Sequence, residues 1–359
     1  MMTRLVSLLL LSTCLQARAA KIECIAGCGT GFDVGSAKGA RLNEPFGVAF
    51  DQKGDGYVCE HEGQKIIKVD SQGHISPFAG FGVLSFGSKT QQTNQAAFNH
   101  PHGLVIAKDQ QMYVADTLNH RVQKIDLKSG EISTIVGTGE AGFSGDGGPA
   151  IRAAFNGIYS LDVNQAGDRI YLADLENRRI RWVDLKSGSV RTFAGNGAQG
   201  VPADGVDAVN APLVDPRAVT VDSTGKVYIL ERGGNALRVV DNRGKITTLI
   251  GPSRDRQSPH SVPETSPDLN GPKHLCIDRQ GNVIVADTEN HLIRKYDPDN
   301  KKLTVIAGTG EKGDRLVPHD PLKTQLNRPH GIFVHSTGAL YISDSGNNRI
   351  LKMTTQSSP

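Results

Sequence analysis

Six residues that stand at equivalent places in a repeat could do binding chemistry together. Each comes just before a short apolar segment, and the six are Phe46, His102, Tyr159, Arg217, Lys273 and His330. A guanidinium can bind a carboxylate through two parallel hydrogen bonds, whereas an ammonium binds it as a point charge. Imidazole nitrogens are zinc ligands. This set therefore indicates an anion site, a metal site, or solvated residues at a loop edge.

The anion hypothesis uses the cations of the set. Arg217 and Lys273 would pair with an acidic group, and Tyr159 would donate a further hydrogen bond. Arg232, just after the acidic residue of the fourth copy, adds another cation. We expect the ligand to be a partner protein or a small acidic molecule. We also expect binding to strengthen below about pH 6.5, as the histidines gain charge.

The metal hypothesis uses the histidines. His102 and His330 each follow a proline and could hold zinc at about 2.0 to 2.1 Å per nitrogen. Calcium is the alternative ion for a metal site at this place. His274, one position further along in the fifth copy, is a third candidate zinc ligand. The other copies have a small residue at this position, as a crowded neck between the copies requires: Gly47, Gly103, Ser160, Ala218 and Gly331.

A repeat of nearly constant length positions these residues. Each copy has apolar segments ending in an acidic residue and a polar turn, and the acidic residues are Glu60, Asp116, Asp174, Glu231, Asp287 and Asp344. Their spacings by subtraction are 56, 58, 57, 56 and 57 residues. Units of this kind bury their apolar faces only against their neighbours.

Each copy reads as four short strands. In the second copy the segments are 103–107, 112–115, 121–125 and 131–136. They are rich in Val, Ile and Tyr and are bounded by turn residues, which is typical of strands. Six copies of four antiparallel strands predict an all-β fold, a six-bladed β-propeller.

The two ends of the repeat region predict how the ring closes. The last copy has its third strand at 349–353 but no fourth strand after it. Residues 21–29 (KIECIAGCG) match the fourth strand of the fifth copy, 302–310 (KLTVIAGTG). We therefore expect the N-terminal strand to complete the last blade, which would remove an open sheet edge.

The loops between blades should share one face with the six residues. In an antiparallel meander, the start of strand one and the end of strand four lie on the same side of the sheet. Long loops on a rigid scaffold often carry binding chemistry. The expected long loops are 28–41, 81–97, 138–154, 195–212, 252–268 and 309–325.

Residues 1–19 have the composition of a secretory signal peptide. Arg4 precedes the apolar stretch 5–11, and small residues stand before a cleavage point after Ala19. We expect a secreted or periplasmic protein with one propeller domain over 20–359. A lipoprotein attached through Cys14 is the alternative, but Thr13 stands where a small Gly or Ala is usual.

The charge of the mature chain is close to zero. The formal net charge of +3 falls to +1 when Arg4 and Arg18 are removed with the signal. Near-neutrality argues against nucleic acid as a partner, and the apolar stretch is too short for membrane insertion. We expect a monomer.

Four cysteines remain after residue 19. Cys59 and Cys276 fall in expected strands and are interpreted as buried apolar thiols. Cys24 and Cys28 could form a small disulfide in an oxidising compartment, but their spacing does not require it.

The recurring Asp-x-x-Asn phrase, often followed by Arg, is better explained by the scaffold than by a site. Asp and Asn side chains satisfy backbone groups in turns. We expect the acidic residue to pair with the Arg at the start of the next strand. The short His61-Glu62 phrase resembles the start of a metalloprotease signature, but it falls in a turn, with Lys65 where the second histidine would stand.

Several phrases resemble NHL repeats: 115–122 (ADTLNHRV), 286–293 (ADTENHLI) and 343–350 (SDSGNNRI). The linking segments 137–149 (GTGEAGFSGDGGP) and 308–313 (GTGEKG) resemble those of secreted bacterial NHL proteins and of the teneurin NHL propeller. The resemblance covers nearly all of the chain after residue 19. It implies the propeller fold but no single function, because such propellers include enzymes, sensors and protein-binding modules.

One enzyme of this kind is similar in part. Peptidyl-α-hydroxyglycine amidating lyases are NHL propellers that bind zinc through three histidines in Pro-His turns on alternate blades. Pro101-His102 and Pro329-His330 match two of these turns, but the third is Pro216-Arg217. The lyase's catalytic Tyr should fall near 174–176, where none stands, whereas Arg232 matches the family's Arg.

The sequence therefore predicts a binding module with its ligand site at the channel mouth. The competing class is an enzyme, a lyase or lactonase-like hydrolase that uses a divalent metal in the same mouth.

Overall fold

The computed structural model describes residues 20–32, 34–80, 90–251 and 268–354. The predicted signal peptide, with Cys14, lies outside the described residues. So do parts of three of the expected long loops, namely residue 33, 81–89 and 252–267.

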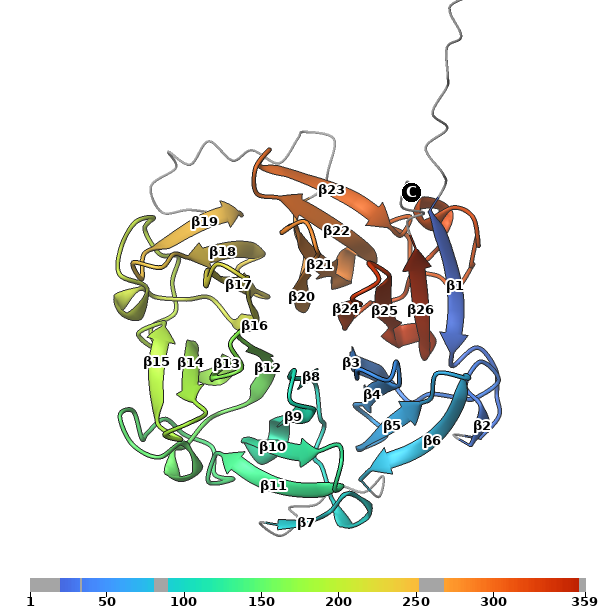
Figure 1. Cartoon of the computed structure of the whole chain (residues 1–359). Coiled ribbons are helices and arrows are strands. Elements are labelled where there is room, and N and C mark those ends of the chain that lie inside the picture. Colours follow the sequence, from blue (N-terminus) through green and yellow to red (C-terminus); the bar gives the residue numbers. More distant parts are fainter. Residues whose placement is uncertain (1–19, 33, 81–89, 252–267, 355–359) are drawn as a thin grey trace, which may run out of the picture.

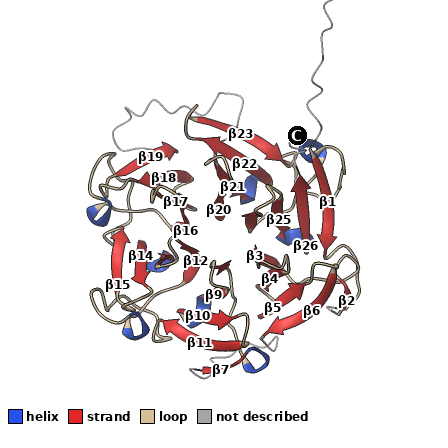
Figure 2. Cartoon of the chain, viewed as in Figure 1, coloured by secondary structure: helices blue, strands red, loops and turns tan. Residues whose placement is uncertain are grey.

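Six antiparallel sheets stand around a central axis, as the six-bladed propeller prediction requires (Figure 1). Regular structure in the described part of the chain is nearly all β, with short 3-10 turns and no α-helix (Figure 2). Within those residues, no helix is long and apolar enough to cross a membrane.

The innermost strand of each blade comes first in that blade's chain order. The first blade comprises β3 (Pro45–Phe50), β4 (Gly56–Glu60), β5 (Lys65–Val69) and β6 (His74–Ala79). The second comprises β8 (Leu104–Ile106), β9 (Gln111–Asp116), β10 (Arg121–Asp126) and β11 (Glu131–Val136). The third comprises β12 (Ile158–Val163), β13 (Arg169–Asp174), β14 (Arg179–Asp184) and β15 (Val190–Ala194). The fourth blade comprises β16 (Pro216–Val221), β17 (Val227–Glu231), β18 (Ala236–Val240) and β19 (Ile246–Ile250). The fifth comprises β20 (His274–Ile277), β21 (Val283–Asp287), β22 (Leu292–Asp297) and β23 (Lys302–Ala307). The sixth comprises β24 (Ile332–Val334), β25 (Leu340–Asp344) and β26 (Arg349–Thr354), together with β1 (Lys21–Ala26).

Eight 3-10 turns lie between strands in the segments that the structure describes. They are η1 (Thr93–Gln95), η2 (Thr117–Asn119), η3 (Ala150–Arg152), η4 (Leu175–Asn177), η5 (Ala208–Asn210), η6 (Thr288–Asn290), η7 (Pro321–Lys323) and η8 (Ser345–Asn347).

The four predicted strands are present in every blade, and two blades carry a further strand. β2 (Gly35–Ser36) pairs with β6, and β7 (Thr90–Gln92) pairs with β11, so the first and second blades have a fifth, outermost strand. Both extra strands come from long loops that run along the outer edge. A loop can add backbone hydrogen bonds to an open edge without any strong strand pattern in its own sequence.

The ring closes as predicted. β1 pairs with β26, with Ile22 opposite Met353 (Figure 1). Burial alternates along β1, so Ile22 and Cys24 face the core while Lys21 and Glu23 face outward. Ile22 packs in a cluster with residues of the fifth and sixth blades.

Cys24 and Cys28 form a disulfide at the end of β1. Cys59 is a buried free thiol, and Cys276 is partly buried. Burial raises the pKa of both thiols, which keeps them protonated and unreactive.

The acidic residue that ends each second strand stabilises its own blade. Each carboxylate accepts a hydrogen bond of 2.7 to 2.8 Å from a backbone N–H 17 or 18 residues earlier; the pairs are Glu60 with Asn43, Asp116 with Asn99, Asp174 with Asn156, Glu231 with Val214, Asp287 with Asn270, and Asp344 with Asn327. The Asn of the phrase adds a side-chain bond in four blades, from Asn119, Asn177, Asn290 and Asn347. The scaffold interpretation of the phrase therefore agrees with the contacts.

The cation that pairs with each acidic residue comes from either of two positions. Arg121 and Arg349 lie five residues after their partners, as expected. In the third blade the expected Arg179 bonds backbone carbonyls instead, and Arg181 faces Asp174. The side chains five and seven residues after the acidic residue lie on the same face of the strand, so either one can reach its carboxylate.

We expect Asp344→Ala to destabilise the protein by about 3 to 5 kcal/mol, because it removes one partner of a buried ion pair. Asp344 accepts bonds from Asn327 N, Asn347 Nδ2 and Arg349 Nε. Denaturant unfolding measures the loss. Asp299→Ala, in an exposed turn, is the control and should change stability by less than about 0.5 kcal/mol. Equal losses in the two variants would contradict the structural role.

Closure by β1 predicts a large effect of Ile22→Ala, about 2 to 5 kcal/mol, because the side chain is fully buried. Lys21→Ala, on the exposed face of the same strand, should be nearly neutral. Thermal unfolding of both variants separates a core strand from a loosely attached one. A neutral Ile22→Ala would show that β1 does not complete the blade in solution.

Candidate functional site

The six aligned residues gather at one mouth of the central channel. Each lies at the start of the innermost strand of its blade or within two residues before it. These strands, β3, β8, β12, β16, β20 and β24, surround the axis (Figure 1). We call this set the mouth ring: Phe46, His102, Tyr159, Arg217, Lys273 and His330.

Members of the mouth ring contact one another around the axis. Phe46 stacks on His330, with ring centroids 4.0 Å apart, and lies 5.0 Å from His102. His102 meets Tyr159 edge-on at 4.6 Å. The Arg217 guanidinium carbon lies 4.5 Å from the centroid of the Tyr159 ring. Five of the six side chains are therefore in contact, whereas Lys273 pairs with Glu289.

The turn that carries each ring residue is held by the scaffold interaction described above. The backbone N–H bound by the acidic residue belongs, in every blade, to the residue three positions before the ring residue, as with Asn99 and His102. The residue two positions before the ring residue always has positive φ; these are Glu44, His100, Gly157, Asp215, Gly271 and Arg328. The ring side chains are thus presented by six matching turns.

Small residues follow the ring residues because the neck is crowded, as expected. A Cβ on Gly331 would clash with the backbone carbonyl of Phe46. One on Gly47 would lie 3.0 to 3.1 Å from backbone atoms of the second blade. His274, which replaces a small residue, lines a cavity of about 320 Å³ in the channel together with Leu161 and Val219.

Arg217 is a buried cation without a carboxylate. Only 4% of it is exposed. Its contacts in the described residues are the Tyr159 ring and one long hydrogen bond, from Nη1 to the Tyr159 carbonyl at 3.4 Å. Burial lowers the pKa of the guanidinium, an effect that a paired anion would oppose. A guanidinium with five donors therefore has most of its binding capacity unused.

The other predicted cations already have acidic partners. Lys273 Nζ lies 3.0 Å from Glu289 Oε1, which also binds Arg328 at 3.0 Å. Arg232 Nη2 lies 3.2 Å from Asp215 Oδ2. Lys273 and Arg232 are therefore less available to a ligand than the sequence analysis supposed.

The histidines of the mouth are held neutral. His102 and His330 each donate Nδ1–H to a backbone carbonyl, of His100 and Arg328. Burial, together with the nearby charge of Arg217, lowers the pKa of both imidazoles well below the usual value. Burial also lowers the pKa of His274 to about 4. The expectation that these histidines gain charge just below pH 6.5 is therefore wrong.

Zinc does not fit the predicted ligands His102 and His330. Arg217 occupies the third alternate turn, and a fixed positive charge there disfavours a divalent cation. The Phe46 ring packs against both imidazoles. Calcium fits no better, because it needs several oxygen ligands and the mouth ring has no carboxylate.

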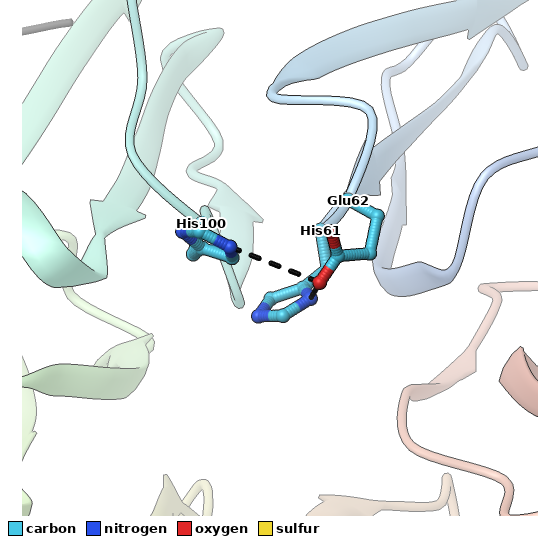
Figure 3. A group of neighbouring side chains, drawn as sticks. All are labelled: His61, Glu62 and His100. Carbon is cyan, nitrogen blue, oxygen red and sulfur yellow. Dashed lines mark ion pairs between the residues drawn. The ribbon is translucent and has the colours of Figure 1, made fainter. Parts of the chain in front are cut away.

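A second group of polar side chains, which the alignment of the repeats did not indicate, lies beside the mouth ring. His61, in the turn after β4, stacks on the Phe46 face at 4.3 Å and contacts His100 and His102 at 4.7 and 4.6 Å. His100 comes from the turn before β8, and Glu62 lies beside both imidazoles (Figure 3). Their place in the repeat could have indicated them, since the turn after the second strand of each blade lies on the same face of the propeller as the mouth ring.

Comparison with known proteins finds similarity to NHL-repeat proteins. A family model described as the teneurin NHL domain matches residues 185–358, and an NHL repeat model matches 98–125. Human NHL repeat-containing protein 2 is 26% identical over 86% of this chain and 46% of its own length. The chain therefore contains NHL repeats and has the six-bladed β-propeller fold. It spans less than half the length of the curated relatives that it matches first.

Solved structures agree on the fold. A structure titled an auxiliary nutrient binding protein from Bacteroides thetaiotaomicron has a TM-score of 0.67 at 12% identity, covering 94% of this chain and 77% of that one. A streptogramin B lyase structure has a TM-score of 0.55 at 14% identity, covering 94% and 99%. At such identities the likeness concerns the fold alone.

A lowered histidine pKa predicts how stability depends on pH. A group whose folded pKa lies below its unfolded value contributes stability fully above about pH 6.5, and this is lost as pH falls toward the folded pKa. For His274 that window extends down to about pH 4. We therefore expect His274→Gln to lose less melting temperature than the wild type between pH 7.5 and 4.5. The control is His74→Gln, at an exposed position, and an identical pH profile in all three proteins would contradict the assignment.

Proposed function

We propose that this propeller is a binding module that recognises an acidic group at its channel mouth. The observation that supports this most strongly is the buried Arg217, which has no carboxylate partner among the described residues. Burial of a cation is costly unless an anion or several hydrogen bonds compensate it. A bound carboxylate would supply both.

Other buried arginines of the chain support this interpretation by contrast. Arg121 and Arg238 lie 2.7 and 2.6 Å from carboxylates that the fold itself provides. Arg217 differs because its neighbours are the Tyr159 ring and the neutral imidazoles. The ligand would therefore take the place that an acidic side chain fills elsewhere in the molecule.

The proposed ligand is an acidic side chain of a partner protein or a small carboxylate. Arg217 would make the main charged contact, and Tyr159 is placed beside it to donate a hydrogen bond. Lys273, His274, His102, His330 and Arg232 form the surrounding wall. Residues 1–19 support export, so we propose that the ligand is met outside the cytoplasm.

The competing proposal is a metal-dependent lyase or lactonase-like hydrolase in the same mouth. The propeller fold is compatible with it, since a lyase shares the fold. It is the weaker proposal because Arg217 stands at the third ligand position and no Tyr stands at 174–176. Binding rather than catalysis therefore accounts better for the mouth ring.

The test compares a tetraglutamate peptide with a tetraglutamine peptide by calorimetry. We expect only the acidic peptide to bind, and more weakly as salt rises, because salt screens charges. Arg217→Gln should weaken binding by about 10- to 150-fold, the value of a charged hydrogen bond of about 1.5 to 3 kcal/mol. Affinity should change little between pH 7.5 and 5.5, because the mouth histidines stay neutral.

Arg232→Gln is the matched control, since this arginine is already paired with Asp215, and it should bind nearly as the wild type does. Equal weakening in both variants would indicate a diffuse charge effect. Unchanged binding by Arg217→Gln would place the ligand elsewhere, and the long loops would then be the next region to examine.

A further inference from the structure

Three side chains from two blades converge at the rim of the mouth. His61 and Glu62 lie in the turn after β4, and His100 lies in the turn before β8 (Figure 3). One ligand-type atom from each lies within 4.8 Å of the other two. Within the described residues, this is the one group of three or more histidine, cysteine and acidic side chains so arranged.

The spacing of these atoms approaches that of ligands around one ion. Glu62 Oε1 lies 3.4 Å from His61 Nδ1 and 3.7 Å from His100 Nε2. Ligands about 2.0 to 2.2 Å from a tetrahedral zinc ion lie roughly 3.3 to 3.5 Å from one another. Small side-chain rotations would therefore bring all three atoms to bonding distance.

The kinds of donor also select the ion. Two imidazoles with a carboxylate suit zinc or a similar transition metal, whereas calcium and magnesium prefer oxygen ligands alone. Glu44 Oε2 lies 3.0 Å from His61 Nδ1. This second carboxylate could complete the ligand set or hold the imidazole in place.

The backbone under this group is held in an unfavourable conformation. Glu44 and His100 have φ of 50° and 49°. The matching positions in the third and fifth blades are Gly157 and Gly271, which adopt such angles without strain. Asp215 and Arg328 adopt the same conformation in the fourth and sixth blades, so these angles belong to the shared turns; here they fix the position of His100 beside His61.

We propose that His61, Glu62 and His100 bind a zinc ion at the rim between the first and second blades. This site is separate from Arg217, because the rings of His102 and Tyr159 lie between His61 and the guanidinium. The proposal does not depend on the proposed anion site, and either can fail alone.

The experiment uses the whole protein, stripped of metal by a chelator. Zinc chloride is titrated by calorimetry, and cobalt chloride is followed by visible absorption. We expect one zinc ion per chain and the intense bands of tetrahedral cobalt, without the near-ultraviolet band of cobalt bound to thiolate. The absence of the thiolate band would show that cobalt is bound by this site and not by the cysteines.

Two variants remove ligands without disturbing the fold. Glu62→Gln keeps the size of an exposed side chain and removes its charge. His100→Asn keeps a residue that tolerates positive φ. We expect each to weaken zinc binding by about 100-fold or more, as judged from the tenfold to 100-fold loss for outer-shell partners alone.

His74→Gln is the matched control, because His74, at the start of β6, and Asp70, in the turn before it, form an exposed histidine–carboxylate pair 3.2 Å apart. It should bind zinc as the wild type does. The proposal is overturned if the wild type binds no zinc, or if Glu62→Gln and His100→Asn bind it normally. It is also overturned if His330→Gln abolishes binding while those two variants do not.

Discussion

The buried bond between an acidic side chain and a distant backbone N–H is the interaction on which this propeller depends. It occurs once in each blade, from Glu60 to Asp344, always at the end of the second strand. It ties that strand end to the chain segment entering the same blade. Because each blade packs only on its neighbours, the regularity of this bond keeps the six blades equivalent.

The same bond positions the mouth of the channel. The bound N–H belongs to the residue three positions before the ring residue, so scaffold and site share one turn. A propeller can therefore change the ring side chains without changing the turns that carry them. This explains how Phe46, His102 and Arg217 can be chemically unlike and still occupy matching places.

The treatment of charge distinguishes the scaffold from the mouth. In the blades, buried arginines such as Arg121 and Arg294 face carboxylates supplied by the same repeat. At the mouth, Lys273 and Arg232 are neutralised by Glu289 and Asp215, whereas Arg217 is buried and no carboxylate of the described segments pairs with it. One unpaired positive charge at the mouth can attract an anion strongly, because charges interact strongly where water is excluded.

The sequence by itself determined the all-β class, the six blades, the closing strand and the alignment of the mouth ring. Those features follow from the period of the repeat and from the alternation of polar and apolar residues, as at Lys21, Ile22 and Glu23 of β1. The tertiary structure alone decided which cations are already paired, why His274 stays neutral, and that His61 and Glu62 meet His100 from the next blade. These depend on side-chain reach and on exclusion of water between blades, which no spacing along the chain encodes.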